Sequence, residues 1–312
     1  MQIRRGYQVA RAGDSGRVVA IGNFDGVHLG HQALVAAARD VAMSGQSVAV
    51  ITFEPHPREV FDPLGAPKRL MRVTDKAVAL ARLGVAELIV LNFDHELRRM
   101  SPDDFATTVL AQGLDVRHVV IGAGFRYGAG RAGDVVSLRR AGESLHFSVT
   151  EVPTVDAAGD RVSSTRVRAA VATGDLAAAS TLLGRAYSLA GRVGHGQRLG
   201  RELGFPTANL RLHSRAVELS GIYAVRVYGV SGHPGPLNAV ASVGTRPTVG
   251  GIEPLLEVNI FDFNGDLYGQ RIEVEFIARL RDEERFDSLP ALVAQMHADA
   301  LRARQILAAH AA

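Results

Sequence analysis

Two histidines in a glycine-containing stretch, residues 22–31, are the first side chains that could carry chemistry. The stretch follows a short apolar run and precedes a long helical pattern, so it is expected at the carboxyl end of a strand. His28 and His31 are three residues apart and share one face at a helix start. Helix-start amides favour a phosphate there, and two imidazoles suit the charge that develops on phosphorus during transfer. Metal-binding or ordinary surface histidines are the alternative, which the strand-to-helix setting disfavours.

A second polar stretch agrees with the phosphate interpretation. Ser164 and Thr165 precede a helical run and can supply a cap and exposed amides. Arg168 follows about one turn later, and its guanidinium can bind phosphate oxygens bidentately. Taken alone, the stretch would be a plain helix cap with solvated arginines. Together with the two histidines, it favours a triphosphate site.

A further set of polar residues lies in the second half of the chain. The glycine-rich stretch 191–201 can wrap phosphates with backbone amides. Thr207 and Asn209 alternate with Ala208, so on a strand both side chains point to one side. A hydroxyl and an amide oxygen are hard, neutral ligands that suit Mg²⁺ bound with a nucleotide.

Glu257 is the candidate base of this second site. It lies in the apolar strand pattern 255–260, where a carboxylate is either paired or functional. Phosphorylation of an alcohol needs a group that accepts the hydroxyl proton. The alternative is a glutamate at a barrel edge that faces water.

The first half of the chain alternates apolar runs with helical patterns. This alternation predicts a parallel sheet covered on both faces. Ser101 and Pro102 form a good helix start, with a cap and a proline at the first position. The expected strands are 18–21, 47–53, 87–91 and 118–121, and the expected helices are 28–43, 74–83 and 102–111.

The pattern changes near residue 186. Tyr223, Val225 and Val227 alternate with residues of the opposite face, and turn residues are dense, which predicts an antiparallel sheet or small barrel. We expect two short helices at 165–172 and 175–183 between the halves, and a closing helix at 288–307.

The motifs of both halves resemble one known family. The His-x-Gly-His and Ser-Ser-Thr-x-x-Arg pair is similar to the nucleotidyltransferase superfamily. The stretch 22–31, with Thr-Phe-Glu-Pro-His-Pro at 52–57, resembles the bacterial bifunctional riboflavin kinase/FAD synthetase family. The second half of the chain resembles the riboflavin kinase module of that family, through motifs at 204–209, 244–248, 266–269 and 280–283 and through Phe286.

The resemblance implies an α/β plus β architecture. A Rossmann-like nucleotidyltransferase domain with a parallel sheet would span residues 1–185 and transfer an adenylyl group from ATP to FMN, giving FAD and pyrophosphate. His28, His31 and Arg168 would be catalytic there. The residues that would contact ATP are Gly22, Asn23, Phe24, Asp25, Gly26, His28, His31, Ser164, Thr165 and Arg168.

The same resemblance implies a small antiparallel β-barrel of the riboflavin kinase fold, with a C-terminal helix, over residues 186–312. It would phosphorylate riboflavin to FMN with ATP as co-substrate and Mg²⁺ as cofactor. Glu257 would activate the terminal ribityl hydroxyl, and Thr207 and Asn209 would hold the metal. ATP would contact Gly194, His195, Gly196, Gly200, Thr207 and Asn209, and the flavin would contact Arg281, Glu283 and Phe286.

Two departures from the family pattern leave alternatives open. Gly124 stands where the family usually has Asn or Asp in the adenylyl-transfer site. A riboflavin kinase with a weakened adenylyltransferase domain is therefore one alternative. The sequence pI of about 9.5 suggests another, a non-enzymatic flavin- or RNA-binding regulator. Asn259 stands where the family often has His, and we expect a change in packing or flavin contact there.

Composition narrows the class of protein. The 312 residues are 47% hydrophobic and 21% charged, as in an ordinary globular protein. The absence of cysteine excludes disulfides, iron–sulfur clusters and Cys-ligated zinc. The net charge of +3 comes without long blocks of like charge, so no nucleic-acid partner is expected. We find no signal peptide or membrane-spanning run and expect a cytoplasmic protein, monomeric or weakly homo-oligomeric.

Overall fold

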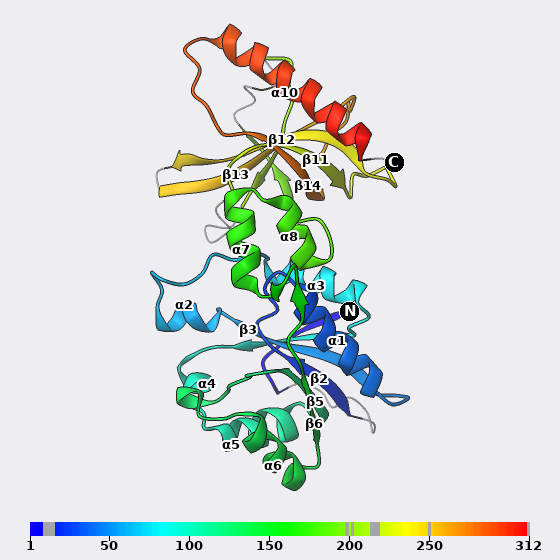
Figure 1. Cartoon of the computed structure of the whole chain (residues 1–312), viewed down its shortest axis with the longest axis vertical. Coiled ribbons are helices and arrows are strands. Elements are labelled where there is room, and N and C mark those ends of the chain that lie inside the picture. Colours follow the sequence, from blue (N-terminus) through cyan, green and yellow to red (C-terminus); the bar gives the residue numbers. More distant parts are fainter. Residues whose placement is uncertain (9–15, 197–199, 201–202, 213–218, 249–250, 311–312) are drawn as a thin grey trace. The chain divides into compact units, whose positions relative to one another are not determined.

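The computed structural model describes residues 1–8, 16–196, 200, 203–212, 219–248 and 251–310 (Figure 1). The chain divides into two compact units. The N-terminal unit comprises Met1–Pro67 and Arg72–Ser164, and the C-terminal unit comprises Lys68–Met71 and Thr165–Ala312.

The N-terminal unit is built on a parallel sheet, as the sequence predicts. Its strands are β1 Gln2–Arg5, β2 Arg17–Ile21, β3 Ser47–Glu54, β4 Glu87–Asn92, β5 Val116–Gly122 and β6 Ser148–Val152, in the order β1-β4-β3-β2-β5-β6. The four expected strands are confirmed to within two residues at each end. The edge strands β1 and β6 were not expected, because most of their side chains are only half-buried or exposed and no buried run marks them.

Helices cover both faces of this sheet. They are α1 Leu29–Val41, α2 Pro57–Phe61, α3 Val73–Arg82, α4 His95–Arg99, α5 Pro102–Asp104, the π-helical segment η1 Phe105–Gly113, the 3₁₀ turn η2 Ala129–Arg131 and α6 Val135–Leu145. The segments η1 and α6 bury Val109 and Leu138 in one core cluster with Val19 and Ile21 of β2. The predicted start at Ser101 is confirmed, since its hydroxyl accepts the Asp104 amide at 3.1 Å.

Strand order places the expected phosphate site at a switch point. From β2 the chain passes through α1 to β3 and β4 on one side, and later returns to β5 on the other side of β2. The switch point therefore lies between the carboxyl ends of β2 and β5, which is where ligands bind in open α/β sheets. The stretch 22–31 follows β2, and Gly124 follows β5, so both lie at this end.

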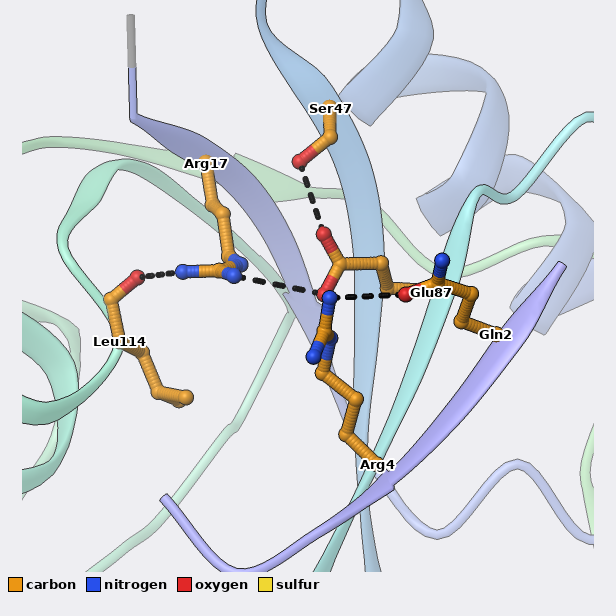
Figure 2. Close-up of polar contacts among 6 residues, drawn as sticks. All are labelled: Gln2, Arg4, Arg17, Ser47, Glu87 and Leu114. Atoms are coloured by element: carbon orange, nitrogen blue, oxygen red, sulfur yellow. Dashed lines mark hydrogen bonds and ion pairs between the residues drawn. The ribbon is translucent and has the colours of Figure 1, made fainter. Parts of the chain in front are cut away.

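A buried charge cluster lies at the opposite, amino end of the strands (Figure 2). The carboxylate of Glu87 in β4 accepts hydrogen bonds from Arg4 Nε of β1 at 2.7 Å and from Ser47 Oγ of β3 at 3.3 Å. It also forms an ion pair with Arg17 of β2, at a nitrogen–oxygen distance of 3.4 Å. Arg17 is 1% exposed and also donates to the carbonyl of Leu114 at 2.7 Å. One carboxylate thus ties together the first residues of several strands and holds the short edge strand β1.

The C-terminal unit is a closed barrel of six antiparallel strands, which confirms the predicted barrel. The strands are β9 Ser188–Gly194, β10 Ala208–Arg211, β11 Gly221–Tyr228, β12 Leu237–Thr248, β13 Gly251–Ile260 and β14 Arg271–Arg281, in the order β10-β13-β12-β11-β14-β9. The predicted closing helix is α10 Leu289–Ala309, which lies across the outside of the barrel and contacts β11, β12 and β14 (Figure 1).

The two short helices between the halves are α7 Ser164–Thr173 and α8 Leu176–Leu183, as expected. Their contacts group them with the barrel, because α8 packs on β14 and Gly174 lies against the side chain of Arg279. The predicted functional boundary at residues 185/186 stays a prediction. No helix within the described ranges is long and apolar enough to cross a membrane.

Candidate functional sites

His28 forms the start of α1. Its Nδ1 accepts a hydrogen bond from the amide of His31 at 3.4 Å. Because Nδ1 is the acceptor, the proton of a neutral imidazole lies on Nε2. The imidazole rings of His28 and His31 are stacked, with centroids 3.7 Å apart and 15° between their planes. His28 is only 7% exposed. The two histidines therefore lie together at the carboxyl end of β2, and the Nε2–H of His28 is a donor suited to a phosphate oxygen.

The turn before His28 has an unusual backbone. Phe24, Gly26 and Val27 have positive φ values of 50°, 84° and 45°. Phe24 is fully buried, and its ring centroid lies 4.8 Å from that of His31. Gly22 lies close beneath this ring, since an added Cβ would be 3.3 Å from it. Phe24 therefore shapes the turn from inside, and its predicted contact with ATP stays a prediction.

Ser164 connects the two predicted phosphate motifs within the N-terminal unit. Its hydroxyl donates to the carbonyl of Asp25 at 2.9 Å, 139 residues away in the chain. Thr165 and Arg168 belong to the C-terminal unit, where Arg168 Nε donates to the carbonyl of Lys68 at 2.6 Å. The structure thus brings Ser164 to the histidine turn, whereas a shared ATP contact of Thr165 and Arg168 stays a prediction.

Two neighbouring cavities open on the barrel. One, of about 380 Å³, lies between the barrel and α10, and its lining includes Thr207, Glu257, Arg281 and Glu283 together with Asp299 of α10. This cavity brings together the predicted base and two of the three predicted flavin residues. The third, Phe286, lies beneath the Arg281 guanidinium, whose carbon is 5.6 Å from the ring centroid.

The second cavity, of about 640 Å³, takes in predicted ATP residues. It is lined by Gly196, Thr207 and Asn209 and by the β13–β14 connection at 263–268. Thr207 lines both cavities, so the predicted nucleotide and flavin pockets meet there.

The remaining predicted ATP residues lie around the strand β10. Gly194 pairs with Asn209 across β9 and β10, and the ring of His195 contacts that of Tyr268 at 4.1 Å between centroids. The amide of Phe205 donates to the carbonyl of Gly200 at 2.7 Å. Residues 197–199 and 201 of the predicted phosphate loop, and the side chains of 245–248 in the motif 244–248, lie outside the described residues.

Asn209 has the features of a metal ligand. It is 7% exposed, and its Nδ2 donates to the carbonyl and hydroxyl oxygens of Thr207 at 3.1 and 3.3 Å. Its Oδ1 is buried with no hydrogen-bond donor in the part of the chain that the structure describes. A buried acceptor left unsatisfied is costly. A Cβ at Gly196 would strike this amide group, so only glycine lets the backbone pack this closely against Asn209. A hard cation shared with phosphates fits this donor set.

Glu257 lies on the same face of the sheet as Asn209. The two residues are direct partners in the β10–β13 register, and opposed residues of an antiparallel pair share a face. Glu283 also lines the flavin-side cavity. Burial raises the pKa of Glu283, Arg281 opposes the rise, and the nearby Glu257 adds to it. Two carboxylates therefore meet at this cavity.

Arg281 is held rigidly against α10. Its Nε lies 3.0 Å from both carboxylate oxygens of Asp299, and a terminal nitrogen lies 2.8 Å from Oδ2. Gln295 donates to the same carboxylate at 3.0 Å. Sequence reasoning did not find Asp299, which is buried and anchors a predicted flavin residue.

The two departures from the expected motifs have clear places in the structure. Asn259 lines the flavin-side cavity and donates to the carbonyl of Pro206 at 2.8 Å, so it takes part in packing. Gly124 has φ +75°, and an added Cβ would meet no heavy atom within 4 Å. The Cβ position of Gly124 is therefore unobstructed.

Comparison with known proteins assigns the family. The family model described as FAD synthetase matches residues 10–166, and the one described as Riboflavin kinase matches residues 183–307. The bifunctional riboflavin kinase/FMN adenylyltransferase of Pseudomonas fluorescens is 45% identical, covering 99% of this chain and 98% of its own. The protein of that name from Escherichia coli K12 is 42% identical, covering 98% and 97%.

A solved structure agrees over almost the whole chain. A Streptococcus pneumoniae protein described as a macrolide-efflux protein superimposes with a TM-score of 0.78 at 32% identity, covering 95% of this chain and 97% of that one. That likeness supports the fold, whereas the curated relatives and both family models agree on the enzyme class. The chain belongs to the family of bifunctional riboflavin kinase/FMN adenylyltransferases.

Proposed function

We propose that the two activities of this family are divided between the two units of the chain. The barrel phosphorylates riboflavin, and the parallel-sheet unit transfers an adenylyl group from a second ATP to the resulting FMN. The observation that carries the proposal is the meeting of two cavities at Thr207, with Asn209 and Glu257 paired on adjacent strands beside it. The chain matches the family models of both enzyme domains, and this argues against the alternative of a non-enzymatic regulator.

In the barrel, ATP occupies the cavity lined by Gly196 and Asn209, and riboflavin occupies the cavity below α10. Thr207 and Asn209 would hold Mg²⁺, which when bound neutralises charge on the phosphates. Glu257 accepts the proton of the terminal ribityl hydroxyl as its oxygen bonds to the γ-phosphorus, and ADP leaves. Arg281, fixed by Asp299, orients the flavin together with Glu283 and Phe286.

In the N-terminal unit, a phosphate oxygen of FMN attacks the α-phosphorus of ATP while the bond to the pyrophosphate oxygen breaks. His28 and His31 donate to phosphate oxygens as negative charge builds on the phosphorus. Ser164 fixes the Asp25 carbonyl of the turn. The triphosphate contacts of Thr165 and Arg168 stay predictions from the sequence. The reaction needs no covalent protein intermediate, because position and electrostatics lower the barrier.

A product assay tests the division. Riboflavin, ATP and Mg²⁺ are incubated with the protein, and FMN and FAD are resolved over time. We expect FMN to appear first, FAD to follow after a lag, and chelation of Mg²⁺ to stop both. FMN without FAD from the folded protein would favour the kinase-only alternative. The cytoplasmic location, the monomeric or weakly homo-oligomeric state and the absence of a nucleic-acid partner stay predictions.

Gly124→Asn is expected to speed adenylyl transfer from ATP to supplied FMN. Asparagine tolerates positive φ better than other residues with a Cβ, and open space surrounds the Cβ position. One new hydrogen bond to the reacting groups, worth about 1 kcal/mol, corresponds to roughly a fivefold gain in rate. The measurement is the initial rate of FAD formation, and riboflavin phosphorylation serves as the internal reference.

Gly124→Ala is the matched control for that substitution. It adds the Cβ and its backbone strain without an amide group, so it should be no faster than the natural protein. If the Asn and Ala variants have equal rates, a polar side chain at this position has no role in adenylyl transfer. The glycine at position 124 then has no effect on the rate of that reaction.

A further inference from the structure

Lys76 is a buried cation that neither proposed mechanism uses. It is one of only two lysines in the chain, lies on α3 and is 2% exposed. Lysine is among the residue types least often buried unless it is paired, because removing an ammonium group from water is costly. Its position therefore calls for a specific explanation in the groups it touches.

The ammonium of Lys76 reaches the adenylyltransferase turn. Its Nζ donates to the carbonyl of Asn23 at 2.6 Å and to the hydroxyl of Thr52 at 3.0 Å. The same hydroxyl donates to the Asn23 carbonyl at 3.0 Å. One carbonyl oxygen at the end of β2 thus receives two hydrogen bonds, one from a charged group, from side chains on α3 and β3. A charge-assisted hydrogen bond of this length is a strong one.

The turn that follows Asn23 needs such anchoring. Phe24 and Val27 adopt positive φ, a region that is unfavourable for residues other than glycine and most so for a β-branched one. A conformation of this kind persists only where its surroundings fix it. Two further carbonyls of the turn are held in the same way, that of Asp25 by Ser164 and that of Val27 by Gln32 Nε2 at 3.1 Å.

We propose that Lys76 is a positioning residue for adenylyl transfer. By holding the Asn23 carbonyl, it fixes the turn that carries the phosphate-facing amides and sets His28 at the start of α1. Its charge also adds positive potential on the buried side of the turn, which favours a bound triphosphate. This inference rests on the proposed function of the turn as the ATP-phosphate site of the N-terminal unit.

The test measures adenylyl transfer with ATP and FMN varied separately. Lys76→Met should lower kcat/KM for ATP by about 100-fold, because a displacement of about 1 Å in a reacting group can cost that factor. Thr52→Val, which removes only the hydroxyl, should lower it by about tenfold, while Thr52→Ser, which keeps the hydroxyl, should stay within about twofold. In each case KM for FMN and the rate of riboflavin phosphorylation should be unchanged.

Controls separate positioning from loss of folding. Arg82→Met removes a positive charge from an exposed position of the same helix and should leave kcat/KM for ATP unchanged. Thermal unfolding of each variant shows whether the N-terminal unit is folded at the assay temperature. If Lys76→Met does not fold, the comparison of Thr52→Val with Thr52→Ser decides.

The inference is overturned if the folded Lys76→Met variant keeps its ATP parameters, if KM for FMN rises as much as that for ATP, or if Thr52→Val and Thr52→Ser behave alike. His28→Ala in the same assay tests the proposed function separately. Full adenylyl transfer by His28→Ala would reject the turn as the ATP site, whatever Lys76 does.

Discussion

Glu257→Ala should abolish FMN formation while leaving FAD formation from supplied FMN at its natural rate. A positioned general base contributes about 10²- to 10⁴-fold to a reaction rate, so kcat for riboflavin phosphorylation should fall by about that factor. Adenylyl transfer is spared because the histidine turn belongs to the other compact unit. The two rates are measured on one protein preparation, with riboflavin or FMN as the flavin substrate, so each reaction reports on the folding of the chain.

Glu283→Gln is the informative control, because Glu283 is the rival base. It lines the same cavity as Glu257, and a raised pKa is what a base working near neutral pH requires. The strand register favours Glu257, because it is the one of these two carboxylates that pairs directly with Asn209, the proposed metal ligand. Glu283→Gln should therefore raise KM for riboflavin and leave kcat largely intact.

Two outcomes would contradict these roles. If Glu257→Ala disables both reactions in a folded protein, the division into two sites is wrong. If Glu283→Gln lowers kcat more than Glu257→Ala does, Glu283 is the base, and Glu257 serves only to bind. The second outcome would keep the kinase in the barrel and change only the residue that accepts the proton.

The sequence predicted the parts of the fold that are buried on both sides. The strands β2, β3 and β4 are nearly continuous buried runs. Such strands can be recognised in a sequence as short, unbroken stretches of apolar residues. The edge strands β1 and β6 have no such run. The strand β1 depends on a contact that no local pattern contains, because Arg4 and its partner Glu87 are 83 residues apart.

In the candidate sites, too, the sequence predicted local motifs but not the contacts between residues far apart in the chain. His28 and His31, or Thr207 and Asn209, lie within one continuous motif, so their spacing already implied a shared face. Lys76 and Asn23 are 53 residues apart, and Asp299 meets Arg281 from a different element. Side chains that position a site from another element leave no signature in the motif they support. The segment Lys68–Met71 likewise joins the C-terminal unit through contacts, such as that with Arg168, that the sequence did not indicate.

His28→Ala should have the opposite effect to Glu257→Ala. It removes a donor aimed at the charge that builds on phosphorus, a type of loss that costs about 10²- to 10³-fold in rate. FAD formation from FMN should fall by that factor, and riboflavin phosphorylation should continue. The measurement is the pair of initial rates under saturating ATP.

The substitution to alanine also removes the helix cap that Nδ1 provides, which is worth about 1 kcal/mol of stability. His28→Asn separates the two effects, because asparagine caps a helix well and has no imidazole. If the imidazole acts on the phosphate, His28→Asn restores the stability of the N-terminal unit and still fails to make FAD. Recovery of FAD formation in His28→Asn would mean that His28 acts only by starting α1, and the charge on phosphorus would then have to be met by His31 or by the backbone amides of the turn.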